Sequence, residues 1–174
     1  MDSSTRRRRR AVRTVVAGVG VSLLLTGCGF DMQTLQQYTP AHGVNVDLEA
    51  GEAKRQLKVR NLLVVSDESG EGYLSASIVS PVADELVKVE GIAHKSDNSE
   101  GGALTVSGSP VKLEPNRLVV LTDPEPAYTV SGADLQPGLT VDLVLTFASG
   151  LEAATTAPVM SSEDPIYATV SPKA

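Results

Sequence analysis

Alternation of hydrophobic and polar residues dominates the chain from Gly43 onward. The clearest case is 140–147, where hydrophobic side chains at every second position would line one face of a strand. Short runs rich in Val, Leu, Ile and Thr follow one another about every ten residues, separated by Gly, Pro, Asn, Asp and Ser. No stretch shows a helical period. The pattern predicts about nine or ten strands, at 44–48, 56–66, 73–80, 86–93, 104–106, 111–113, 118–121, 128–130, 139–147 and 151–159.

Two stretches depart from strict alternation. Residues 56–66 alternate at first and then become continuously apolar from Leu62 to Val65, which predicts a strand that is buried on both faces or carries a bulge. The acidic, glycine-rich stretch Ser96–Gly102 is predicted to be a loop, with Gly101 and Gly102 as a hinge. Because antiparallel strands joined by short turns bury one face of each sheet, we expect an all-β antiparallel sandwich over residues 43–160.

The N-terminal residues follow a different pattern. Arg6–Arg10 and Arg13 precede the apolar run Thr14–Leu25, and the run ends at Leu25-Thr26-Gly27-Cys28. A basic region, an apolar region and small residues before a cut are typical of a secretory signal. This version resembles the bacterial lipobox, which implies cleavage between Gly27 and Cys28 and a covalent lipid (a diacylglyceryl group, with palmitate as an acyl chain) on the Cys28 thiol. Residues 1–27 are therefore predicted to be a lipoprotein signal peptide.

Two alternatives to the lipobox agree less well with the sequence. A transmembrane anchor is disfavoured because Thr14–Leu25 has 12 residues, whereas a spanning helix needs about 20. An ordinary signal peptide would leave one unpaired thiol in an exported chain, which lipidation explains better. The Arg9-Arg10 pair leaves the export route open between the general secretory and twin-arginine pathways.

The lipid would fix the location of the protein. About two or three acyl chains on Cys28 would hold the chain at the membrane, whereas one chain alone binds marginally. We therefore expect a lipid anchor in the cell membrane, with the protein on the extracytoplasmic face. Residues 28–42 are predicted to be a lipidated tether, and 161–174 a flexible C-terminal tail.

Charge narrows the possible partners. Six of the 15 basic residues and one of the 21 acidic residues lie in residues 1–27, so the remaining chain has 9 basic and 20 acidic residues and a formal charge of −11. This charge argues against a nucleic-acid partner and against electrostatic docking on anionic lipid. With no Trp, two Phe and four Tyr, the chain also lacks the residues that build base-stacking platforms.

The sequence contains no recognisable catalytic motif. It has no Gly-x-Ser-x-Gly elbow and no glycine-rich phosphate loop, and its one cysteine would carry the lipid. Asp67–Gly72 resembles the start of a calcium loop, but Ile78 stands where a bidentate Glu is required, so we interpret it as a hairpin turn. The prediction is a non-enzymatic binding or interaction module with an unknown protein or small-ligand partner.

Several motifs resemble the PCu(A)C copper chaperone family. The second half of that family is matched by Leu113-Glu114-Pro115-Asn116-Arg117, Leu135-Gln136-Pro137-Gly138 and the strand and turn at 141–150; the first half is matched by Val59-Arg60-Asn61-Leu62, Tyr73–Val79 and Asp84–Val89. The resemblance covers about residues 44–159. It implies a cupredoxin-like, immunoglobulin-like β-sandwich, in agreement with the strand pattern.

The resemblance also raises the question of copper. The family binds Cu(I) through two His and two Met, soft ligands that suit this ion. Here His94 lies near the position of the first ligand, no Met follows it in 95–102, and 118–121 contains neither residue. The leading expectation is therefore a copper-chaperone-like scaffold without the copper site, with the lipid on Cys28 as its only bound group. The alternative is an extracytoplasmic copper chaperone with a non-standard site of His94 and further ligands such as Met160 or Met32.

Overall fold

The computed structural model describes residues 41–52 and 54–167. The predicted signal peptide, most of the predicted tether and residues 168–174 lie outside this part of the chain. Within the described residues, all regular secondary structure is β-strand. These residues belong to one compact unit that begins at Ala41. The eleven strands are β1 (Val44–Ala50), β2 (Arg55–Ser66), β3 (Glu71–Val79), β4 (Asp84–His94), β5 (Glu100–Ala103), β6 (Thr105–Gly108), β7 (Val111–Leu113), β8 (Leu118–Val120), β9 (Tyr128–Ser131), β10 (Thr140–Phe147) and β11 (Glu152–Ser161).

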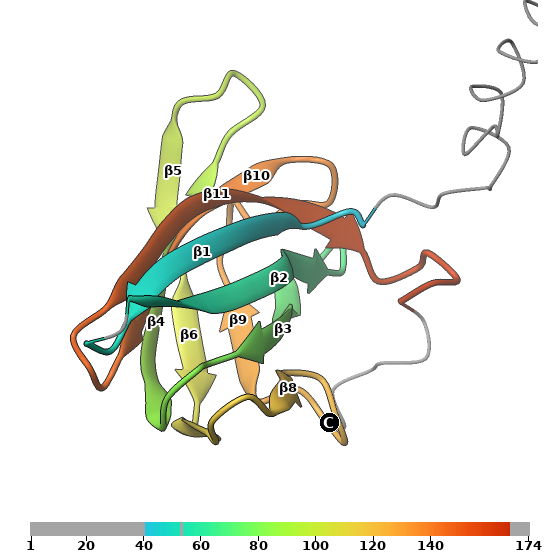
Figure 1. The fold of residues 1–174 in the computed structure, drawn as a ribbon. Coiled ribbons are helices and arrows are strands. Elements are labelled where there is room, and N and C mark those ends of the chain that lie inside the picture. The colour runs from blue at the N-terminus through green and yellow to red at the C-terminus, as the bar shows by residue number, and fades with distance from the viewer. Residues whose placement is uncertain (1–40, 53, 168–174) are drawn as a thin grey trace, which may run out of the picture. The chain divides into compact units, whose positions relative to one another are not determined.

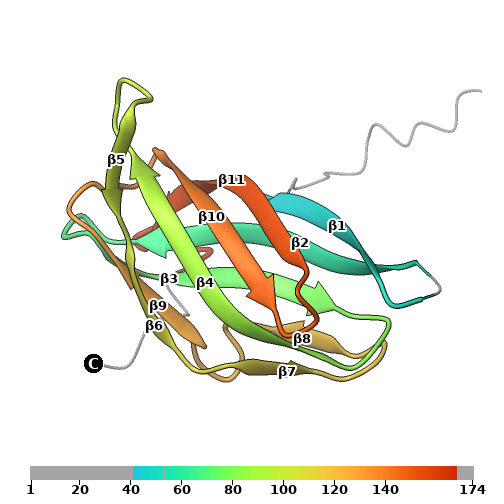
Figure 2. The ribbon, with the colours of Figure 1, turned by 90° about the vertical axis from the view of Figure 1, so that its left-hand side faces the viewer.

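The strands form two layers. One layer, the β2 sheet, contains β1, β2, β3, β6, β8 and β9, and the other, the β10 sheet, contains β4, β5, β7, β10 and β11 (Figures 1 and 2). β11 joins the layers, because it pairs with β10 along 152–158 and its last residues, Val159–Ser161, pair in parallel with Val64–Ser66 of β2. The other strand ladders are antiparallel. The result is a barrel-like sandwich, and the predicted all-β sandwich is confirmed.

Ten of the strands were predicted from the sequence, and β5 was not. The prediction that Ser96–Gly102 is entirely a loop is wrong, since β5 begins at Glu100 and includes both glycines. β5 pairs with β4 through Ile92↔Ala103 and His94↔Glu100, and the Gly102 amide donates a hydrogen bond to Asp134 Oδ2 at 2.8 Å. Tertiary pairing therefore overrides the low strand propensity of glycine.

The core follows the predicted alternation. Val141, Leu143, Leu145 and Phe147 of β10 point inward and are at most 1% exposed. Each such side chain contributes about 1.5–3 kcal/mol relative to an exposed position. Because β10 lies between β4 and β11, its outward residues occupy the middle of the outer face of the β10 sheet, where the candidate site lies.

One edge of the β10 sheet is incomplete. Along its outer edge, β4 pairs with β7 at Asp84–Leu86 and with β5 at Ile92–His94. Between them the chain turns at Leu104, and β6 leaves to pair with β9 of the other sheet (Figure 2). The Leu104 amide donates to the Gly91 carbonyl at 2.8 Å. The stretch 87–91 otherwise has no strand partner on this side among the described residues.

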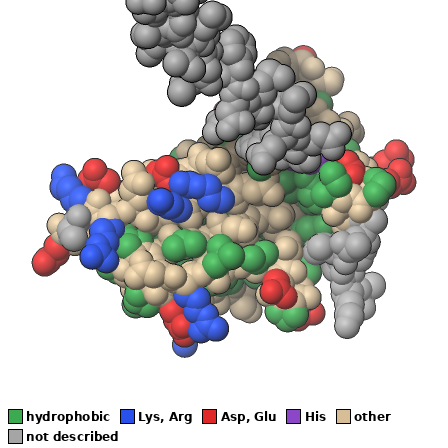
Figure 3. Space-filling model, turned by 45° about the vertical axis from the view of Figure 1, so that its right-hand side comes forward, with side chains coloured by type: hydrophobic (Ala, Val, Ile, Leu, Met, Phe, Trp, Pro, Cys, Tyr) green, Lys and Arg blue, Asp and Glu red, His purple; other side chains and the backbone are tan. Residues whose placement is uncertain are grey.

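The outer face of the β2 sheet carries a small second apolar cluster, called the Leu63 cluster below. Leu63, Val65 and Tyr73 are buried there beneath Met160 and Tyr167. Figure 3 views the molecule from this side and shows hydrophobic side chains in a row with Lys and Arg side chains nearby. The cluster explains why Leu62–Val65 is continuously apolar. Leu62 and Val64 pack in the main core, whereas Leu63 and Val65 pack in this second cluster.

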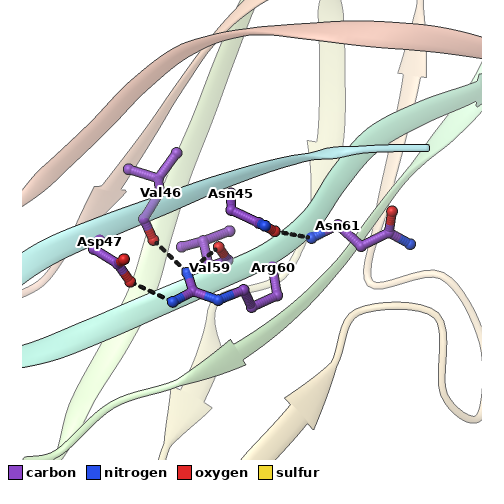
Figure 4. Close-up of polar contacts among 6 residues, drawn as sticks. All are labelled: Asn45, Val46, Asp47, Val59, Arg60 and Asn61. Atoms are coloured by element: carbon purple, nitrogen blue, oxygen red, sulfur yellow. Dashed lines mark hydrogen bonds and ion pairs between the residues drawn. The ribbon is translucent and has the colours of Figure 1, made fainter. Parts of the chain in front are cut away.

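β2 also contains the bulge that its sequence suggested. The register with β3 shifts between Arg60 and Leu63, and Asn61 adopts a positive φ of 53°. Its amide donates to Asn45 Oδ1 at 3.0 Å, and Arg60 beside it donates to the Val46 and Val59 carbonyls and to Asp47 Oδ1 (Figure 4). Side chains from β1 therefore stabilise the irregular backbone of β2.

Candidate functional site

His94 lies at the end of β4, on the outer face of the β10 sheet. Its ring is largely covered, with 16% of the side chain exposed. Nδ1 lies 3.1 Å from Thr140 Oγ1, and Nε2 lies 2.9 Å from Asp142 Oδ2. Both ring nitrogens therefore already have partners on the neighbouring strand, so a metal ion would have to displace one of them.

Asp142 contacts polar side chains on both neighbouring strands, His94 of β4 and Thr156 of β11. Thr156 of β11 donates a hydrogen bond to Oδ1 at 2.6 Å, and His94 contacts the other oxygen. Two hydrogen bonds lower the pKa of the Asp142 carboxyl below its usual range: the one from Thr156 contributes most, and the one from His94 contributes next. The carboxylate is thus held ionised on the sheet surface at neutral pH, where 46% of the side chain remains exposed.

An apolar groove of about 530 Å³ begins beside Asp142. It follows the incomplete edge of β4, where the corner at Leu104 leaves space between β4 and β6. A Cβ added at Gly91 would lie 3.0 Å from Leu104 Cδ1, and one at Gly132 would lie 2.7 Å from Leu104 Cδ2, so these glycines make room for the Leu104 side chain. The groove is lined by Val89, Glu90, Gly91, Ile92, Ala103, Leu104, Val106, Asp142 and Val144.

The lining combines apolar surface with two kinds of polar group. Val89 and Gly91 belong to the unpaired stretch of β4 and are turned toward the core, so they offer mainly backbone to the groove. Glu90 and Asp142 supply carboxylates, and no Lys or Arg is among the lining residues. Glu90 forms an ion pair with Lys88 at 2.8 Å, with both side chains 58% exposed. A concave apolar site with a few polar groups is typical of small-molecule binding.

Several solved PCuAC domains are among the structures similar to this chain. The copper-bound PCuAC domain from PmoF2 has 16% identity and a TM-score of 0.41, and covers 67% of this chain and 98% of that chain. The apo PmoF2 PCuAC domain has 14% identity, a TM-score of 0.45 and coverages of 68% and 97%. The apo PCuAC domain from PmoF1 has 20% identity, a TM-score of 0.44 and coverages of 67% and 99%.

These domains belong to the family that the sequence resembles. With identities of 20% or less and TM-scores below 0.5, the similarity does not place this chain in that family, and nothing about its ligand follows from it. No protein-family model matches the chain, and no curated protein does either.

The residues around His94 do not fit a copper site. The partners of the two ring nitrogens are a hydroxyl and a carboxylate oxygen, which are hard ligands, whereas Cu(I) prefers thioether and imidazole. Within 41–52 and 54–167, no group of three or more His, Cys, Asp or Glu is arranged to hold a metal ion. Met160 packs in the Leu63 cluster, and Met32 lies outside the described residues.

The other predicted site residues belong to the N-terminal segment. Gly27 and Cys28 lie outside the described residues, so the cleavage site and the lipid anchor stay predictions. In the part of the chain that the structure does describe, no helix is long and apolar enough to cross a membrane.

Sequence reasoning missed the groove and Asp142. Asp142 did give a signal, since it is the one acidic residue in the alternating strand 140–147. The groove gave none, because it depends on the place where β6 leaves β4.

Proposed function

We propose that this protein is a lipoprotein of the cell envelope, anchored through Cys28 at the extracytoplasmic face of the membrane, and that its sandwich is a non-enzymatic binding module. The lipobox-like sequence at 25–28 supports the anchor. The groove beside β4 is the single observation that carries the binding role, since its volume of about 530 Å³ lies within the range of about 300–1,000 Å³ typical of ligand pockets.

The chemistry of the groove favours a small apolar molecule that carries an amine. Its apolar lining offers surface for a hydrocarbon or aromatic body, and the partly exposed carboxylates of Glu90 and Asp142 are part of the same lining. The Lys88–Glu90 pair is exposed, and exposed ion pairs contribute at most about 1 kcal/mol. A ligand ammonium group can therefore replace Lys88 at little cost.

Indole compounds provide a direct test, because the chain contains no Trp. The fluorescence of an added indole then reports its own environment. Tryptamine, tryptophol and indole-3-propionate share one apolar body and carry a cation, a neutral group and an anion. We expect the affinity to fall in that order when each is titrated with the chain from residue 28 onward, with Cys28 replaced by Ser.

Two substitutions on β10 locate the binding site. Val144→Lys adds a cation within the groove lining, and we expect it to abolish the preference for tryptamine. Thr146→Lys adds the same charge two residues further along the same outward face, outside the lining, and should leave binding unchanged. Equal affinities for the three indoles, or equal effects of the two variants, would contradict the proposed site.

The anchor is tested by metabolic labelling with palmitate. Cys28→Ala should abolish incorporation of the label and block normal maturation, because the thiol that accepts the lipid is gone. Continued labelling of the Cys28→Ala variant would refute the lipid anchor, whatever the groove binds.

Copper binding is tested separately by competition for Cu(I) with a chelator. Since His94 is held by Thr140 and Asp142, we expect His94→Ala to leave the Cu(I) affinity unchanged. A sub-nanomolar affinity that His94→Ala destroys would instead support a copper chaperone.

A further inference from the structure

We infer that the groove binds the free N-terminus of an extended peptide, which pairs through its backbone with the incomplete edge of β4. This inference rests on the proposed binding role of the groove and names the class of amine that it takes. A simple alkyl or aryl amine would use the apolar lining and the carboxylates, but it would leave the backbone of β4 without a partner.

The backbone of Val89 faces the groove. The Gly91 carbonyl points away from β10, since it accepts the Leu104 amide. Alternate residues of a strand direct their backbone groups to the same edge, and the register of β4 with β10 is regular from 88 to 93. Val89 therefore presents its N–H and C=O in the same direction as Gly91. No strand pairs with Val89 on that side among the described residues.

This position is poorly supplied with water, because Val89 is 6% exposed. Backbone N–H and C=O groups that are covered and unpaired cost free energy, and for this reason nearly all of them have partners in folded proteins. A ligand that brings its own amide and carbonyl to Val89 would recover this cost. A peptide carries both groups on one residue, at the spacing that strand pairing requires.

The gap along this edge has room for about three residues (Figure 2). Leu104 closes one end at Gly91, and β7 closes the other at Leu86. Between these ends Val87 is an extra residue, because the register with β10 shifts there. The positions left to pair are 88–90, which correspond to roughly 10 Å of extended chain.

The charges of the groove determine the direction of the peptide. β5 and β7 both run antiparallel to β4, so a peptide that continues their line begins at the Gly91 end. Its first residue then lies opposite Glu90, and Asp142 belongs to the same lining. These carboxylates attract the ammonium of a free N-terminus, whereas the opposite direction would bring a C-terminal carboxylate against them.

The closed end of the gap explains why a terminus is required. Because the Leu104 amide already occupies the Gly91 carbonyl, a longer chain could not continue along the edge beyond this point. An internal segment of a protein would therefore have to leave the groove at its most acidic end. A free N-terminus ends there and places its charge beside Glu90.

The pairing also predicts which side chain the groove selects. The second residue of the peptide lies opposite Val89, and cross-strand partners point to the same side of a sheet. Its side chain is therefore directed inward, toward the part of the lining formed by Leu104 and Val106. We expect an apolar residue at this second position, with its amide and carbonyl exchanging two hydrogen bonds with Val89.

Trp-containing tripeptide amides test the pairing, because the chain has no Trp and the fluorescence of the peptide then reports its own environment. The parent peptide is leucyl-tryptophyl-alanine amide, with Trp at the second position. It is titrated with the chain from residue 28 onward, with Cys28 replaced by Ser. We expect it to bind about tenfold more tightly than tryptamine, because it adds two hydrogen bonds to Val89.

Two methylated peptides isolate the backbone contact. Methylation of the second amide nitrogen removes the donor to the Val89 carbonyl, and should weaken binding by about three- to tenfold. Methylation of the third amide nitrogen is the matched control. This nitrogen faces away from β4 in an extended chain, so the affinity should stay unchanged.

Acetylation of the peptide tests recognition of the N-terminus. Loss of the ammonium should weaken binding by about tenfold. Glu90→Gln should reduce this difference between the free and the acetylated peptide. Glu152→Gln is the matched control, since Glu152 is an exposed carboxylate on β11 outside the lining, and it should leave the difference unchanged.

Hydrogen exchange of single amides, measured by NMR, detects the pairing on the protein. The parent peptide should slow exchange of the Val89 amide, and tryptamine should not. The Lys88 and Glu90 amides serve as the reference, because alternation directs them toward β10, where both residues are already paired.

The possible failures are distinguishable. If tryptamine binds but the parent peptide binds no more tightly, or the Val89 amide gains no protection, the strand pairing is overturned and the amine site stands. Equal affinities of the free and acetylated peptides would overturn recognition of the N-terminus. Absence of binding by both tryptamine and the peptide would overturn the proposed function of the groove itself.

Discussion

A single carboxylate, that of Asp67, closes the turn between β2 and β3. Asp67 Oδ1 accepts hydrogen bonds from the Ser69 amide at 2.9 Å, the Ser69 hydroxyl at 2.7 Å and the Glu71 amide at 3.0 Å. The turn that resembled a calcium loop is thus closed by its own side chain, and Gly70 supplies a φ of 83°. The Ser69 hydroxyl makes the largest contribution to lowering the pKa of the Asp67 carboxyl.

Asp67→Asn should lower the free energy of unfolding at neutral pH by about 1 kcal/mol, because the ionised acceptor is lost. Since the folded-state pKa lies below the unfolded value of 3.8, this contribution is present above that value and is lost as the pH falls through the folded-state pKa. Urea denaturation of both proteins from pH 7 to pH 3 should show the difference shrinking with acid. Glu68→Gln, in the same turn, is the control and should have no effect.

Asn61 shows how one residue can set a bulge. Its positive φ is unfavourable for most residues other than Gly and Asn, and its Oδ1 accepts a hydrogen bond from the Gly43 amide at 2.8 Å. Asn61→Ala should destabilise the protein by about 1–2 kcal/mol, since it loses the acceptor and retains the strain. Asn61→Gly loses only the acceptor and should cost about 1 kcal/mol or less. Chemical denaturation ranks the two variants, and a larger cost for Gly would contradict the role of the backbone.

At the level of strands, alternation was sufficient to predict the faces of β10 and the existence and approximate place of ten strands. It could not predict β5, whose Glu-Gly-Gly-Ala sequence has no strand pattern and is ordered by β4 and Asp134. The groove could not be predicted from the sequence for a related reason. It exists because the chain changes sheets at Leu104, and local sequence does not encode which sheet a short strand joins.

The alternation of β10 predicts unequal costs for neighbouring truncations. Leu143 is fully buried, so Leu143→Ala should lower the free energy of unfolding by about 3–5 kcal/mol through lost burial and a cavity. Val144 points outward and is half-buried, so Val144→Ala should cost less than about 1.5 kcal/mol. Guanidinium denaturation compares them, and similar costs would mean that the assigned register of β10 is wrong.

At the scale of the whole domain, its two ends meet on the outer face of the β2 sheet. His42, from the end of the predicted tether, lies 2.6 Å from Tyr167 Oη through its Nδ1. Tyr167 in turn covers Leu63, Val65 and Tyr73. Residues 161–174 were predicted only to be a flexible C-terminal tail, because the cluster that Tyr167 covers is formed by β2 and β3 and is not visible in the sequence of the tail.

Tyr167 therefore joins both ends of the domain to β2 and β3, and two substitutions separate its roles. Tyr167→Phe keeps the ring over the Leu63 cluster and loses only the bond to His42, so it should cost at most about 1 kcal/mol. Tyr167→Ala uncovers the cluster, and should cost about 2–4 kcal/mol. Urea denaturation measures both costs, and hydrogen exchange should show faster exchange in β2 at 63–65 for the Ala variant alone. Equal costs would assign the stabilisation to the hydroxyl, and no cost in either variant would mean that the C-terminal segment does not stabilise the sheet.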